Sequence, residues 1–192
     1  MLSVSGTALA QSRAMELTND SADTVGYARI PHDARLTPQQ FTLEARITPQ
    51  GRGYQASNQL GAMFVSKPRE GSSGRFIQAF GFAWSPTTER LRALIARQQG
   101  SSGKEVYSNS LVPLGETRHV AMTFDGTWLR IYIDGELDAE GEAGFSVIDY
   151  EDNPLLIGAG NFAKAVLLPA LEATPARLAY VANRQAAGAS HA

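Results

Sequence analysis

The chain has 192 residues, enough for one domain with a sizeable core, and its 43% hydrophobic and 19% charged residues exclude an intrinsically disordered protein. Its 17 Lys and Arg residues against 19 Asp and Glu give a net charge of -2, so we expect no nucleic-acid partner. The absence of cysteine excludes a disulfide framework, a thiolate metal cluster and a cysteine nucleophile.

The first segment, residues 1–13, is expected to form an N-terminal arm. Its stretch Met1–Gln11 ends in an Ala-x-Ala-like group but lacks the basic region and apolar core of a signal peptide, so no signal peptide is evident. No later stretch approaches the ~18 uninterrupted apolar residues of a membrane-spanning helix. We therefore expect no membrane insertion.

The following residues alternate in short runs separated by Gly, Pro, Ser, Asn and Asp, a pattern typical of an all-β sandwich or barrel. In Phe41–Ile47 the odd positions are apolar and the even ones polar, which predicts a strand with one buried face. In Arg75–Trp84 aromatic residues occupy most even positions, and Ile77, Ala79 and Ala83 line the other face. This second run is expected to be a central strand covered on both faces.

The middle of the chain predicts more strands. Arg90–Arg97 has good helix propensity, but turn signals bound it closely, so strand is favoured and helix stays the alternative. The runs Val120–Phe124 and Leu129–Ile133 alternate and are each followed by Asp-Gly, at Asp125-Gly126 and Asp134-Gly135. Because Asp-Gly tolerates the positive φ of tight hairpin turns, these runs predict a meander.

Six pieces of the chain, in order, carry a family resemblance: Ala14–Leu17, Tyr27–Pro31, Phe41–Ile47, His119–Gly126, Leu129–Gly135 and Leu155–Gly158. Together they resemble a laminin-G-like domain of the concanavalin A-like lectin/glucanase superfamily. The resemblance implies an antiparallel two-sheet jelly-roll sandwich over residues 14–182, in which Arg177–Ala182 returns beside the first strand. Residues 183–192 are then expected to be a C-terminal tail.

Two departures from the family pattern bear on function. Thr117 stands where the family usually has a Trp before His119, and Trp128 in the hairpin is a candidate substitute for the lost aromatic volume. Near the end, Thr174–Ala179 replaces the usual Gly-x-Ile-Asp-Glu-Val. The missing acid weakens any transfer of the family's calcium site to this chain.

The superfamily includes glycoside hydrolases, so the resemblance raises the question of a catalytic site. A retaining glycosidase needs two carboxyl groups about 5–5.5 Å apart. The nearest match to the superfamily's Glu-x-Asp-x-x-Glu strand is Glu136–Glu142, where Gly141 takes the place of the second Glu, so a solvated edge strand is favoured. His32, His119 and His191 lie far apart in sequence without a catalytic motif. We predict no catalytic residue and no enzyme, with a glycoside hydrolase as a remote alternative.

Calcium is the cofactor that the sequence raises. Asn19–Asp23 offers several hard oxygens in a loop where the resemblance places a metal in relatives. The loop lacks EF-hand spacing, and only Glu172 stands near the place of the missing acid. An Asx-rich turn that satisfies its own backbone is favoured. We therefore predict no metal-binding or cofactor-binding residue, with Ca²⁺ as the alternative.

Charge is unevenly distributed. Between Ile131 and Ala163 no Lys or Arg accompanies the acids, so one edge of the sandwich is expected to be acidic, whereas Arg90, Arg92 and Arg97 gather on a neighbouring run. Most charged runs of this kind are solvated faces. If the acidic edge and the arginines lie on opposite sides of the fold, however, they would allow two identical copies to pair, or the acidic edge would attract a basic partner. The acids are Asp134, Glu136, Asp138, Glu140, Glu142, Asp149, Glu151 and Asp152.

Two functions are consistent with these features. The favoured one is a structural or adhesive module of an extracellular assembly, for example a virion decoration protein on a phage-like particle. It would lie outside cells or on the virion surface with protein partners, including copies of itself. The alternative is a lectin-like, carbohydrate-binding module in which Trp84, Tyr107 and Trp128 stack on sugar rings, although strand aromatics more often pack within a sheet.

Overall fold

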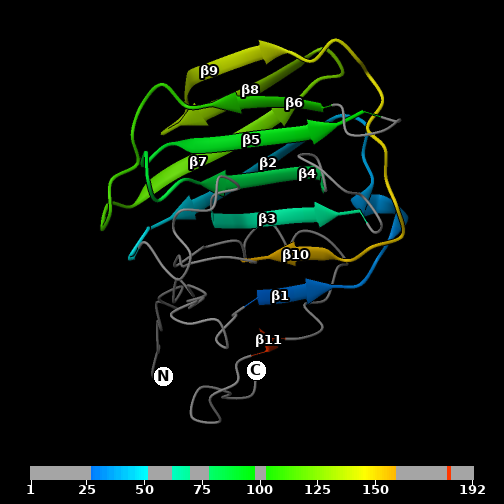
Figure 1. The fold of residues 1–192 in the computed structure, drawn as a ribbon, viewed down its shortest axis with the longest axis horizontal. Coiled ribbons are helices and arrows are strands. Elements are labelled where there is room, and N and C mark those ends of the chain that lie inside the picture. Colours follow the sequence, from blue (N-terminus) through cyan, green and yellow to red (C-terminus); the bar gives the residue numbers. More distant parts are fainter. Residues whose placement is uncertain (1–26, 52–61, 70–77, 98–102, 159–180, 183–192) are drawn as a thin grey trace, which may run out of the picture.

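The computed structural model describes residues 27–51, 62–69, 78–97, 103–158 and 181–182. They form two antiparallel sheets packed face to face, so the predicted all-β sandwich is confirmed (Figure 1). No helix among these residues is long and apolar enough to cross a membrane. Several predictions fall outside the described residues, namely the arm at 1–13, the calcium loop Asn19–Asp23, Glu172, the tail at 183–192 and His191.

The larger sheet has seven strands in the order β11-β1-β10-β3-β4-β5-β6. Its last strand, β11, pairs with β1 through Tyr27 with Ala182 and Ala28 with Val181, as the family resemblance implied. Edge strand β6 ends the sheet on the other side. The bounds are β1 Tyr27–Ile30, β3 Ala62–Pro68, β4 Gln78–Trp84, β5 Leu91–Ala96, β6 Gly103–Tyr107, β10 Leu155–Ile157 and β11 Val181–Ala182.

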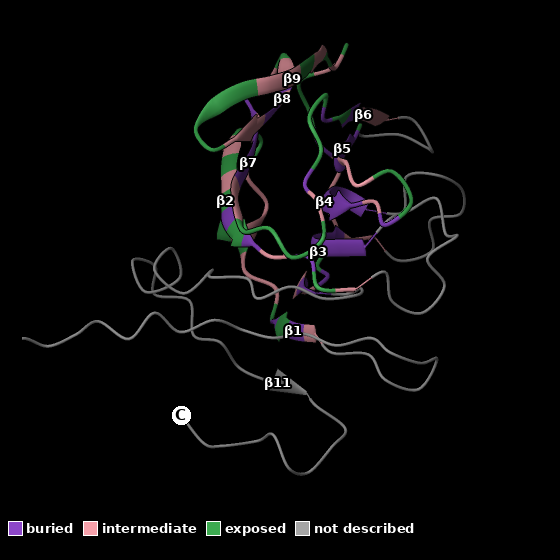
Figure 2. Ribbon diagram, turned by 90° about the vertical axis from the view of Figure 1, so that its left-hand side faces the viewer, coloured by how far each residue is buried: buried purple, intermediate pink, exposed green. Residues whose placement is uncertain are grey.

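The smaller sheet has four strands in the order β2-β7-β8-β9, and a short 3-10 helix, η1 (Ala34–Leu36), precedes it in the chain. Its edge strand β9 packs beside β6, so two strand edges meet along one side of the sandwich (Figure 2). The bounds are β2 Phe41–Ile47, β7 Arg118–Phe124, β8 Trp128–Ile133 and β9 Glu136–Glu142.

Strand β2 follows its predicted alternation. Thr42, Glu44 and Arg46 are exposed, while Ala45 and Ile47 are buried in the core. Since successive side chains of a strand point to opposite faces, this pattern fixes which face of the smaller sheet meets the larger one.

The centre of the larger sheet is buried on both faces. Every residue of β4 and β5 is buried, which confirms the covered central strand from Gln78 onward and shows that the Arg90–Arg97 run is a strand. The indole Nε1 of Trp84 donates a hydrogen bond of 2.7 Å to the Val112 carbonyl. The largest core side chain is therefore anchored to the loop between β6 and β7.

The predicted meander β7-β8-β9 is present, and both Asp-Gly turns form as expected. Gly126 has φ +93 and Gly135 has φ +89, backbone conformations that favour glycine. Asp125 accepts hydrogen bonds from the amides of Thr127 and Trp128 at 2.9 and 2.8 Å. Each turn is thus stabilised by glycine geometry, and the first also by an aspartate that satisfies the turn amides.

Candidate functional site

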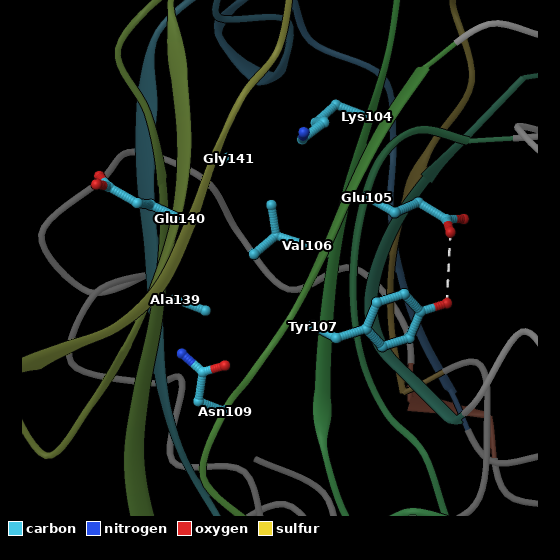
Figure 3. Close-up of a pocket in the computed structure, with 8 residues that line it drawn as sticks. All are labelled: Lys104, Glu105, Val106, Tyr107, Asn109, Ala139, Glu140 and Gly141. Atoms are coloured by element: carbon cyan, nitrogen blue, oxygen red, sulfur yellow. Dashed lines mark hydrogen bonds between the residues drawn. The ribbon is translucent and has the colours of Figure 1, made fainter.

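A cleft of about 270 Å³ lies between the edge strands β6 and β9 (Figure 3). Because it opens where the two sheet edges meet, both layers of the sandwich contribute to its walls. The larger sheet and the loop that follows it supply Lys104, Glu105, Val106, Tyr107 and Asn109, and the smaller sheet supplies Ala139, Glu140 and Gly141.

The alternation of β6 divides its side chains between two faces. Lys104 and Val106 point toward β9, whereas Glu105 and Tyr107 point to the outer face of the larger sheet (Figure 3). Glu105 forms a buried ion pair with Arg92 and accepts a hydrogen bond of 3.3 Å from the Tyr107 hydroxyl. The carboxylate of Glu105 is therefore directed out of the cleft.

The acid on the opposite wall is also engaged elsewhere. Glu140 points away from β6 in Figure 3 and accepts a hydrogen bond of 3.0 Å from Nε of Arg130. The ammonium of Lys104, by contrast, makes no hydrogen bond or ion pair in the part of the chain that the structure describes. The charged group that faces into the cleft is thus the ammonium of Lys104.

Gly141 makes room for this lysine. A Cβ atom at position 141 would lie 2.5 Å from Cε and 2.8 Å from Nζ of Lys104, and 3.2 Å from Cγ2 of Val106. The lysine side chain therefore lies across the bare backbone of β9.

Asp138 holds Asn109, which lies at the lower end of the cleft in Figure 3. A bulge in β9 leaves Asp138 as an extra residue, since Ala139 pairs with Ile131 and Leu137 pairs with Tyr132. The freed carboxylate accepts hydrogen bonds from the amides of Asn109 and Ser110 at 2.6 and 3.1 Å.

Two further hydrogen bonds hold Asn109 in place. Nδ2 of Asn109 donates to the Asp138 carbonyl at 2.5 Å, and the Arg90 guanidinium donates to the Asn109 carbonyl at 2.7 Å. Asn109 is therefore held by both of its neighbours, so its carboxamide is positioned before any ligand arrives.

The three aromatic residues proposed for sugar stacking do not come together. Trp84 is fully buried in the core, so it offers no stacking surface to a sugar. For this residue the alternative interpretation, that strand aromatics pack within the fold, is confirmed. Tyr107 is 42% exposed on the outer face of the larger sheet. Trp128 is half-buried on the outer face of the smaller sheet, with the Arg130 guanidinium carbon 5.9 Å from its ring centroid.

The described histidines take part in separate polar contacts. Nε2 of His119 lies 3.3 Å from a carboxylate oxygen of Glu44 on β2. Nε2 of His32 lies 3.2 Å from Asp152, and its Nδ1 lies 3.3 Å from Nζ of Lys67.

Lys67 is the buried member of the second contact. Its ammonium also donates to the Asn153 carbonyl, and burial lowers the pKa of this lysine despite the opposing charge of Asp152. These contacts join β1, β3 and the segment before β10, and they have the character of structural links.

Of the three arginines that gather at Arg90–Arg97, two are not on a freely solvated face. Arg92 is buried against Glu105, and Arg90 donates to the carbonyls of Ser108 and Asn109. The reason is that neighbouring strands place hydrogen-bond partners beside both side chains. Arg97 is exposed.

Several acids of the predicted edge are likewise engaged. Asp138 accepts hydrogen bonds from the Asn109 and Ser110 amides. The other engaged acids contact basic side chains, in the pairs Asp134–Arg118, Glu140–Arg130, Asp149–Arg69 and Asp152–His32. Among the described residues no group of three His, Asp or Glu side chains gathers as metal ligands do. The calcium loop lies outside these residues.

Comparisons with known proteins agree with this architecture. A model described as the concanavalin A-like lectin/glucanases superfamily matches residues 22–170. The fold is similar to a heptameric SAP-like pentraxin from Limulus polyphemus, at 16% identity and a TM-score of 0.50 over 79% of this chain and 70% of the pentraxin. No curated protein sequence matches the chain.

Two further solved structures share the fold. Domain 4 of AbnA, a GH43 extracellular arabinanase from Geobacillus stearothermophilus in complex with arabinotriose, is 10% identical with a TM-score of 0.50, covering 79% of each chain. The binding domain of Paraclostridial Mosquitocidal Protein 1 is 10% identical with a TM-score of 0.52. The match covers 79% of this chain but only 42% of that domain.

Proposed function

The chain belongs to the concanavalin A-like lectin/glucanase superfamily, and from this we propose that it is a non-enzymatic glycan-binding module that acts outside cells. The cleft between β6 and β9 is the proposed sugar site. Its walls combine an ammonium, a carboxamide and the open backbone edges of two strands.

The observation that carries this proposal is the polar, preformed character of the cleft. Sugars are recognised largely by hydrogen bonds to their hydroxyl groups, and edge strands present backbone donors and acceptors that no neighbouring strand uses. At about 270 Å³ the cleft is close to the lower end of small-molecule sites, roughly 300 Å³. It therefore suits one sugar ring of a longer glycan.

The comparisons support the same proposal over a structural role on a virion. The arabinanase domain of this fold was crystallised with arabinotriose, a sugar, and its parent enzyme is extracellular. A binding role without hydrolysis is favoured because both acids that line the cleft, Glu105 and Glu140, are engaged by arginines outside it. Hydrolysis by the retaining mechanism needs two carboxyl groups about 5–5.5 Å apart at the scissile bond.

A glycan array, with and without calcium, followed by calorimetry on the best ligand, tests the proposal. We expect a glycan to bind the wild-type chain and the affinity to fall at least tenfold in Gly141→Leu, because the new side chain fills the cleft. The matched control is Trp128→Ala, which removes the half-buried ring on the outer face of the smaller sheet and should leave the affinity unchanged.

Two results would overturn the proposal. Failure of the folded wild-type chain to bind any glycan under either condition would reject glycan binding. Loss of binding in Trp128→Ala but not in Gly141→Leu would reject the cleft as the site. Circular dichroism on each variant verifies that the sandwich is intact.

A further inference from the structure

Resting on the proposed glycan-binding function, we propose that the cleft selects sugars that bear a carboxylate, such as uronic acids, through Lys104. The inference rests on the balance of charge inside the cleft and on how the lysine is held there.

The charges around the cleft leave one group uncompensated. Of the two acids in its walls, Glu105 is paired with Arg92 and Glu140 with Arg130, and both side chains point away from the interior (Figure 3). Asp138, which contacts Asn109 from β9, accepts hydrogen bonds from two backbone amides. Lys104 has no such partner among the described residues, so the interior carries a positive charge.

The lysine is positioned by its hydrocarbon stem. Its Cε and Nζ lie over Gly141, within 3 Å of where a Cβ atom would stand, and Cγ2 of Val106 lies 3.2 Å from the same point. A Lys stem packed on apolar surface with its head directed to solvent is a common arrangement. The ammonium is thus held in the cleft by packing, and its charge stays available to a ligand.

The polar groups at the other end suit the hydroxyls of the same sugar. Asn109 stands below Lys104 in the cleft (Figure 3), where its Nδ2 is engaged by the Asp138 carbonyl. The carboxamide oxygen is then an acceptor for a hydroxyl group. A ring with a carboxylate at one end and hydroxyls along the other would match this arrangement of charge and hydrogen-bonding groups.

The test compares two probes of equal length, an oligogalacturonate and the neutral galactose oligomer, by calorimetry at low and physiological salt. The wild-type chain should bind the acidic oligomer about two- to fivefold more tightly, the range expected of a solvent-accessible ion pair, with a smaller preference at higher salt. In Lys104→Met, which keeps the stem and removes the charge, the preference should vanish. In Lys104→Arg it should persist.

Arg46→Met is the matched control, because it removes an equal charge from an exposed position on the smaller sheet. It should leave the preference intact. Equal binding of both oligomers by the wild-type chain, or an equal loss in Arg46→Met and Lys104→Met, would overturn this inference while glycan binding stands. Failure to bind both oligomers while another glycan of the array binds would also overturn this inference alone. Failure to bind any glycan at all would instead reject the proposed function.

Discussion

The carboxylate of Asp138 and the backbone amide of Asn109 lie 2.6 Å apart, although 29 residues separate them in the chain. Their hydrogen bond joins the edge strand of the smaller sheet to the loop that leaves the edge strand of the larger one. It therefore links the two layers with a polar contact at the margin of the sandwich, outside the hydrophobic core.

The first prediction concerns this link. Asp138→Ala removes the acceptor of the Asn109 and Ser110 amides and should lower the free energy of unfolding by about 1–2 kcal/mol, measured by urea denaturation. Glu136→Ala on the same strand is the control, since Glu136 is exposed and has no partner within the described part of the chain, and it should change stability by less than about 0.5 kcal/mol. Equal effects of the two variants would contradict the role assigned to Asp138.

The second prediction uses the two tryptophans. Trp84→Phe should cost about 2 kcal/mol of unfolding free energy, because it leaves a cavity and deprives the Val112 carbonyl of a buried donor. Trp128→Phe, at a half-buried position, should cost less than about 1 kcal/mol.

Fluorescence gives a second readout on the same pair. The remaining tryptophan of Trp128→Phe should emit at shorter wavelength than that of Trp84→Phe, because Trp84 is fully buried. The reverse order of emission maxima would show that the burial of the two rings is assigned wrongly.

The third prediction is a loss of stability in acid that depends on Asp125. Hydrogen bonds from the Trp128 amide, the Arg130 guanidinium and the Thr127 amide lower the pKa of Asp125 from 3.8 to about 2. Because the folded-state pKa is below the unfolded value, the contribution of this carboxylate is present above 3.8 and is lost as the pH falls toward about 2.

Asp125→Asn should therefore destabilise the chain at neutral pH and flatten the fall of unfolding free energy across that acid window. Denaturation at a series of pH values measures the slope, and an NMR titration of the Asp125 carboxyl reports its pKa directly. A wild-type slope retained by the variant would contradict the assignment.

The fourth prediction concerns Lys67, whose pKa is lowered by burial from 10.5. A lysine with a lowered folded-state pKa destabilises the fold while it is charged. Stability should therefore rise as the pH climbs from the folded-state pKa toward 10.5. Lys67→Met should remove this rise, as measured by urea denaturation from neutral to alkaline pH.

Lys104→Met provides the comparison, because it removes a lysine from the open cleft and leaves the buried contacts of Lys67 with His32 and Asn153 in place. The alkaline rise should persist in this variant. Its disappearance in both variants alike would mean that Lys67 is not its source.

The parts of the fold that local rules determine could be predicted from the sequence. The alternation of Phe41–Ile47 depends only on which side chains prefer water, and the turn at Asp125-Gly126 depends on φ angles that glycine tolerates. The run at Arg90–Arg97 was ambiguous because its residues suit a helix, and its pairing with β4 and β6 settles it as a strand.

The cleft could not be predicted in the same way. Lys104 and Asn109 line one cleft because the two sheets end on the same side, and Asp138 reaches Asn109 from a bulge in β9. Neither the shared edge nor the bulge appears in any local pattern. Trp84 and Trp128 both lie in alternating runs, yet one is fully buried and the other half-buried. Their difference depends on which face of the sheet each ring occupies, since Trp84 faces the core between the sheets whereas Trp128 alternates with the buried Leu129 and Ile131.

The bulge at Asp138 has one more consequence, for how the molecule behaves at high concentration. An edge strand ordinarily invites another chain to extend the sheet, but the extra residue breaks the regular spacing of donors and acceptors along β9. The exposed carboxylates of Glu136 and Glu142 repel an incoming strand as well. The margin of the molecule is thereby protected against fibril-like stacking, which keeps the entrance beside it accessible from solution.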